Sequence, residues 1–114
     1  MQQKNISLEE AISKWVSHGD SVVLGACLEA CIPVAAAYEL IRQEFHDLNI
    51  IAPISDMTSD MLIGAGCVSE VTGAWVGNVS GGLGHNYRRS IEQGIPHKVK
   101  INDHSNFSLG MSLY

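Results

Sequence analysis

Segments typical of strands and of helices alternate along the whole chain of 114 residues, and few folds satisfy that pattern. Short apolar runs indicate buried strands, and the amphipathic runs between them indicate helices. Strands are expected at 21–24, 48–52, 68–76 and 97–101, with helices beginning near Ser7, Pro33, Ser55 and Asn86. Strands joined through helices favour a parallel sheet with right-handed crossovers. We therefore predict an open, mainly parallel α/β sheet with helices on both faces.

Capping residues mark several helix ends. Ser7, with Glu10 three positions later, has the pattern of a capping box, and the first helix is expected to end at Gly19. Gly94 is expected to end the helix that begins near Asn86. A mixed segment is expected from Ser105 onward, and its apolar stretch, 107–113, shows neither a helix cap nor a closing strand.

A glycine-rich stretch at 75–89 carries four glycines between positions 77 and 84 and ends on Arg88 and Arg89. Glycines at this density let another molecule approach the main chain, and arginines suit a carboxylate or a phosphate. Taken alone, the stretch favours the simpler alternative of a loop with solvent-facing arginines. Its match to nucleotide-binding loops is poor, since Tyr87 replaces the third glycine and no lysine follows the glycines.

The composition and the charge of the chain limit which classes of partner and which cellular compartment are expected. A net charge of −5 argues against nucleic acid as a partner. The longest apolar span, 22–38, is interrupted by Glu29 and Pro33, so no membrane span is expected. Three cysteines without a C-x-x-C pair indicate reduced thiols and a cytoplasmic protein. The histidines and Cys67 lack the spacing of metal ligands, and no metal site is predicted.

Ligands of open parallel sheets bind outside the carboxyl ends of the strands. Four segments are expected to leave those ends, at 25–32, 53–60, 77–89 and 102–106.

A series of short stretches covers nearly the whole chain in a fixed order. It includes Gly-Asp-Ser-Val-Val-Leu-Gly at 19–25, Ala-Trp-Val-Gly-Asn-Val-Ser at 74–80 and Asp-His-Ser-Asn-Phe-Ser at 103–108, with further pieces at 54–57, 62–68, 86–89 and 92–96. Together they resemble the N-terminal part of the A (alpha) subunit of family I CoA-transferases, the glutaconate CoA-transferase-like group. Such subunits are usually much longer. The resemblance thus implies that 1–114 is a single N-terminal α/β portion of that domain, with an apparently incomplete sheet.

The resemblance also implies an activity. Enzymes of this group move CoA between an acyl-CoA thioester and a small carboxylic acid, and the thioester is attacked by a glutamate nucleophile on the B (beta) subunit. The implied protein is a cytoplasmic hetero-oligomer with a B subunit, inactive as this chain alone and without a permanently bound cofactor. Coenzyme A enters as part of the substrate. No catalytic residue is expected here, and the glutamates at 29, 39, 44, 70 and 92 are expected at the surface.

Seven positions match the substrate-binding segments implied by the resemblance: Gly25, Asn78, Ser80, Arg88, Asp103, His104 and Asn106. The group often has a Gly-Gly-Phe turn after the first strand, and only Gly25 of that turn is present. Whether this turn donates to an oxyanion is open. Asp103 and His104 match an acidic-aromatic or acidic-histidine step, and Asp103 and Asn106 are expected to line the pocket, with helix capping as the alternative for Asp103. Asn78 and Ser80 are candidate donors to a substrate carboxylate, with turn formation as the alternative. Arg88 or Arg89 is expected to hold a dicarboxylate end or a CoA phosphate, with the other arginine facing solvent.

Two other functions stay open at this point. In a related acyl-CoA hydrolase, water would complete the reaction, and independence from a carboxylate acceptor would distinguish it. A non-catalytic remnant serving assembly would turn over no acyl-CoA under any pairing.

Overall fold

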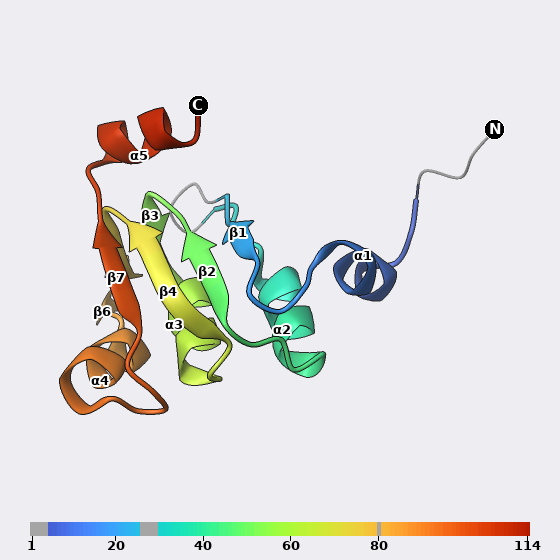
Figure 1. The fold of residues 1–114 in the computed structure, drawn as a ribbon, viewed down its shortest axis with the longest axis horizontal. Helices are drawn as coiled ribbons and strands as arrows, with labels where there is room; N and C mark the ends of the chain where they lie inside the picture. Colours follow the sequence, from blue (N-terminus) through green and yellow to red (C-terminus); the bar gives the residue numbers. More distant parts are fainter. Residues whose placement is uncertain (1–4, 26–29, 80) are drawn as a thin grey trace.

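The computed structural model describes residues 5–25, 30–79 and 81–114 (Figure 1). Its main sheet contains four strands, all parallel, in the order β1, β2, β4, β7. The strands are β1 (Ser21–Val23), β2 (Leu48–Ile51), β4 (Val68–Gly73) and β7 (Lys100–Asp103). The predicted open, parallel α/β sheet with flanking helices is confirmed.

Five helices accompany this sheet in the described part of the chain: α1 (Leu8–Trp15), α2 (Val34–Arg42), α3 (Met57–Gly64), α4 (His85–Gln93) and α5 (Asn106–Ser112). The strand order advances in one direction, so right-handed crossovers place α2, α3 and α4 on the same face (Figure 1). Helices were expected on both faces. Here α1 packs against α2, and α5 lies over the carboxyl ends of the strands. None of these helices is both long and apolar enough to cross a membrane.

The two faces of the main sheet differ in chemistry. The helix-covered face holds the core, with Leu40, Ile50 and Val71 almost fully buried. The opposite face carries polar side chains that are hydrogen-bonded from strand to strand. Asn49 Nδ2 donates to Ser21 Oγ at 3.2 Å, Thr72 Oγ1 to Asn49 Oδ1 at 3.1 Å, and Asn102 Nδ2 to Thr72 Oγ1 at 3.1 Å.

A second, smaller sheet was not predicted. It contains β3 (Ile54–Ser55), β5 (Trp75–Asn78) and β6 (Gly82–Leu83). The expectation of one strand over 68–76 is wrong, because the chain leaves the main sheet at Ala74. The Ala74 N–H donates to Pro53 O at 3.0 Å, and Trp75 then pairs with Ile54 in parallel. The segment 77–89 therefore continues β5, contains β6 and enters α4, instead of leaving the main sheet as one loop.

Capping residues mark the ends of three helices, two of them as predicted from the sequence. Ser7 and Glu10 form the predicted capping box, although α1 ends at Trp15 and not at Gly19. Gly94 ends α4 in the left-handed conformation, with φ of 69°, as predicted. The expectation of no helix cap for the stretch 107–113 is wrong, because Ser105 and Ser108 form a capping box at the start of α5.

The last strand begins later than expected. Ser90 in α4 uses its hydroxyl group twice: it donates to His97 O at 2.7 Å and accepts from Val99 N at 3.0 Å. These backbone groups are thus bonded to a helix residue before the sheet begins, and pairing with β4 starts at Lys100. Asp103 consequently ends β7, whereas it was expected to follow the strand.

Candidate functional site

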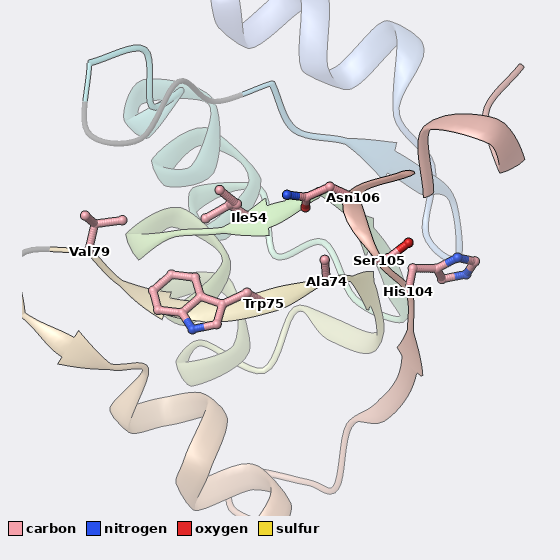
Figure 2. Close-up of a pocket in the computed structure, with 7 residues that line it drawn as sticks. All are labelled: Ile54, Ala74, Trp75, Val79, His104, Ser105 and Asn106. Carbon is pink, nitrogen blue, oxygen red and sulfur yellow. The ribbon is translucent and has the colours of Figure 1, made fainter. Parts of the chain in front are cut away.

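A cleft of about 470 Å³ lies where the chain leaves the carboxyl ends of the strands (Figure 2). Its described lining residues come from β3, from the corner before β5 and the start of β5, from the segment after β5, and from the corner before α5 and the start of α5. They are Ile54, Ala74, Trp75, Val79, His104, Ser105 and Asn106. Because sites of parallel α/β sheets lie at this end, the cleft is the candidate substrate site.

One side of the cleft is apolar. Ile54 and Trp75 are paired residues of neighbouring parallel strands, so the small sheet fixes their relative position. Ala74 and Val79 extend the same wall before and after β5. Such a wall suits the hydrocarbon part of a small ligand.

The other side is polar and belongs to the corner before α5. The His104 N–H donates to Gly73 O at 2.9 Å, which ties this corner to the end of β4. His104 Nδ1 lies 3.2 Å from Ser108 Oγ. Figure 2 shows the imidazole turned away from Trp75, whereas the Asn106 amide points toward Ile54. Asn106 is therefore the polar side chain best placed to meet a ligand in the cleft.

A second cavity of about 230 Å³ adjoins the cleft, because Ala74 and Trp75 line both. Its lining also includes Tyr87 of α4 and Asp103 at the end of β7. Burial raises the pKa of Tyr87, and the negative charge of Asp103 raises it further. The phenol of Tyr87 therefore stays neutral to a higher pH than that of an ordinary tyrosine.

The predicted site residues do not all meet at the cleft. His104 and Asn106 line it, and Asp103 lines the adjoining cavity. Gly25 is exposed just after β1 and is not among the lining residues. Ser80 lies outside the described residues.

Asn78 and Arg88 are not among the residues that line the cleft. Asn78 ends β5, and its Oδ1 atom is buried without a hydrogen-bond partner among the described residues. Arg88 lines a separate groove of about 350 Å³ beside Leu83 and donates to Glu92 at 2.7 Å. Arg88 and Asn106 therefore belong to different sites on the surface.

Trp75 is the main residue that sequence reasoning missed. It stood at the start of the glycine-rich stretch, but nothing there showed that β5 would pair with β3 and present the ring to a cleft. Ile54, Ala74, Val79 and Ser105 were missed for the same reason, since only the second sheet and the cap of α5 bring them together.

The described residues give less support to a metal site or to a glutamate nucleophile within this chain. Among them, no three His, Cys, Asp or Glu side chains gather as metal ligands would. None of the described glutamates lines the cleft. Glu39 accepts from Arg42, Glu70 contacts Lys100, and Glu92 accepts from Arg88. Glu29 is outside the described residues.

The chain is similar to two curated CoA-transferase polypeptides. The A subunit of 3-oxoadipate CoA-transferase from Pseudomonas knackmussii is 38% identical over 94% of this chain and 38% of its own length. The A subunit of glutaconate CoA-transferase from Acidaminococcus fermentans is 33% identical over 90% of this chain and 31% of its own length. No protein-family model matches the sequence.

Solved structures agree with this similarity. Glutaconate CoA-transferase from Acidaminococcus fermentans superposes with a TM-score of 0.84 at 30% identity, covering 93% of this chain and 33% of that chain. The decarboxylase AibA/AibB superposes with a TM-score of 0.77 at 25% identity, covering 90% and 38%. The chain is thus homologous to the A subunits of the two CoA-transferases and shares the fold of the glutaconate CoA-transferase structure, as the sequence resemblance predicted. It spans about a third of the length of these relatives.

Proposed function

We propose that this chain is part of the A subunit of a CoA-transferase, which moves CoA between an acyl-CoA thioester and a small carboxylic acid. The observation that carries the proposal is the cleft at the carboxyl ends of the strands in a chain homologous to two such A subunits. The reaction converts one acyl-CoA and one carboxylate into the other acyl-CoA and the other carboxylate, so no oxidant or metal is needed.

The cleft has the two kinds of surface that this reaction needs. The wall formed by Ile54, Ala74 and Val79 would hold the hydrocarbon part of the acyl group. The Asn106 amide would donate to its carbonyl oxygen, where negative charge develops during attack on the thioester. Gly25 lies outside the described lining of the cleft, so we propose that its backbone meets another part of the substrate.

The remaining predicted residues receive supporting roles in this proposal. Asn78 and Ser80 would bond a carboxylate of the acyl acceptor. Asp103 and His104 would position the acyl group through the corner before α5, which His104 ties to Gly73. Arg88 lies in its own groove, so we assign it to a CoA phosphate, to which it would turn from Glu92.

The nucleophile is proposed to be a glutamate of a B-type partner subunit. This is supported by the absence of any described glutamate from the cleft lining. The chain would then form a hetero-oligomer and be inactive alone, with CoA bound only as part of the substrate. The free thiols of Cys31 and Cys67 suit a cytoplasmic complex.

The fold alone does not determine the reaction, because one structural neighbour is a decarboxylase. The test is to isolate the native protein under mild conditions and to identify by mass the polypeptides in its complex. A partner with an essential glutamate, together with acyl-CoA turnover that requires a carboxylate acceptor, supports the proposal. Turnover without an acceptor indicates a hydrolase, release of CO₂ indicates a decarboxylase, and a complex without turnover indicates an assembly role.

A further inference from the structure

The ring of Trp75 lies against the backbone of Gly77, two residues further along β5. A Cβ atom built at Gly77 would be 2.7 Å from both Cζ2 and Cη2 of the indole. Real Cβ atoms do not approach carbon atoms so closely, so the ring occupies space that a side chain at 77 would need. Figure 2 shows the indole extending along β5 in the direction of Val79. Because Gly77 has no side chain, it leaves the space that the ring fills.

Trp75 borders both cavities at the carboxyl ends of the strands. Trp75 lines the cleft and also the smaller cavity that holds Asp103. Ala74 is the other described residue common to both linings, and its methyl group is too small to close one cavity from the other. The indole of Trp75 thus limits how far a ligand in the cleft can extend.

We propose that Trp75 is a specificity-determining residue that restricts the cleft to short acyl groups, and that Gly77 positions its ring. The inference rests on the proposed function, because it takes the cleft to be the acyl site. A longer chain would have to displace the indole from its place against the backbone of Gly77. Apolar pockets of this kind discriminate between ligands by about 10- to 200-fold per methylene group.

The direct test uses the native complex, with this chain carrying Trp75→Ala or Trp75→Phe. The kcat/KM values are compared for acetyl-, butyryl-, hexanoyl- and octanoyl-CoA. Trp75→Ala should raise the octanoyl-to-butyryl ratio at least about tenfold, and Trp75→Phe should raise it less. The control is Trp15→Phe, in exposed α1, which should leave the ratio unchanged. An unchanged ratio in Trp75→Ala overturns the proposal, including the case in which this variant only weakens assembly with the partner.

The role of Gly77 is tested by a spectroscopic signal. In a Trp15→Phe background, Trp75 is the sole tryptophan of this chain. Gly77→Ala should move its emission to longer wavelength and shift the chain-length preference in the same direction as Trp75→Ala. A folded Gly77→Ala protein with unchanged emission and preference would contradict the positioning role.

The added Cβ also approaches Gly82 O at 2.9 Å, so folding of Gly77→Ala is checked by thermal melting. If Gly77→Ala does not fold, the double variant Trp75→Phe/Gly77→Ala decides, since the smaller ring leaves room for the methyl group. Recovery of folding in the double variant supports the contact between the ring and position 77. If the double variant also fails to fold, the contact with Gly82 O and not the ring excludes a side chain at 77, which overturns the positioning role.

Failure of the proposed function can be separated from failure of this inference. If the complex turns over no acyl-CoA, the proposed function fails, and the length limit is measured by calorimetric binding of butyrate and octanoate. Trp75→Ala should then strengthen octanoate relative to butyrate by about tenfold. Equal changes for the two ligands, or binding of neither, would overturn the inference.

Discussion

The carboxylate of Asp60 in α3 accepts a hydrogen bond from the backbone N–H of Tyr87 in α4, with Oδ1 2.8 Å from the nitrogen. Asn86 Nδ2 donates to the other oxygen at 3.2 Å. The residue before α4 is Gly84, which has no side chain to cap the helix, so Asp60 supplies the cap from another helix. A Cβ at Gly84 would lie 2.9 Å from Oδ1, which explains the glycine. This contact places Tyr87 beside the smaller cavity.

Replacement of Asp60 by Ala should destabilise the protein by about 1–3 kcal/mol, because the part-buried backbone N–H of Tyr87 and side-chain amide of Asn86 lose their acceptor. Urea unfolding followed by circular dichroism measures the change. The matched control is Glu92→Gln, which breaks the exposed pair with Arg88 and should cost less than about 1 kcal/mol. Equal effects of the two substitutions would contradict a capping role for Asp60.

Two glycines should respond to alanine in opposite directions. A Cβ at Gly73 would lie 2.5 Å from the carbonyl oxygen of Ala52, so Gly73→Ala must separate the ends of β2 and β4. We expect a loss of about 2 kcal/mol or more. Gly110 in α5 has no atom within 4 Å of the added Cβ, and Gly110→Ala should stabilise by up to about 1 kcal/mol. Thermal unfolding checks both, and a Gly73→Ala protein as stable as the wild type would refute the close approach.

The raised pKa of Tyr87 predicts a loss of stability in alkali. Burial and then Asp103 favour the neutral phenol in the folded state, so this stabilisation is fully present below the ordinary tyrosine pKa of about 10. It is lost as the pH rises through the higher pKa of the folded state. Tyr87→Phe should therefore weaken the pH dependence of unfolding above about pH 10.

The contribution of Asp103 can be measured separately. Tyrosinate absorbance in a Tyr38→Phe/Tyr114→Phe background reports Tyr87 alone. Asp103→Asn should lower the pKa of Tyr87, because one of its two causes is removed. An unchanged titration would show that Asp103 does not act on Tyr87 through the cavity.

The cysteines should differ in reactivity. Cys67 is buried, and burial raises the pKa of its thiol, whereas Cys31 is exposed. In a Cys27→Ser protein, iodoacetamide at mildly alkaline pH should modify Cys31 in the native state and Cys67 only after unfolding. Mass spectrometry of the time course gives the two rates. Similar rates in the native protein would contradict the burial of Cys67.

The sequence predicts the main sheet because its strands are apolar runs with local boundaries. The parallel pairing of β1, β2, β4 and β7 follows from the intervening helices, and Ser7 and Gly94 mark helix ends through their own side chain or backbone. These features depend on residues near one another in the chain.

The differences between the predicted and the observed fold arise mostly from contacts between residues that are far apart in the chain. The strand over 68–76 breaks because Ala74 bonds to Pro53, and β7 starts late because Ser90 holds His97 and Val99. The cleft depends on the same contacts, so Asn106 could be proposed from the sequence but the wall with Trp75 could not. The start of α5 is different, because its cap is local: Ser108 takes the place of the glutamate or glutamine that is typical of a capping box.

If the cleft serves transfer of CoA to a carboxylic acid, the label of the acid must appear in the thioester. The most direct measurement incubates the native complex with an unlabelled acyl-CoA and an isotopically labelled small carboxylate, and follows labelled acyl-CoA by mass spectrometry. We predict labelled acyl-CoA with the wild-type complex, at least about 100-fold less with Asn106→Ala, as for loss of an oxyanion donor, and none with this chain alone. Free CoA without labelled acyl-CoA, or transfer that is unaffected by Asn106→Ala, would contradict this role of the cleft.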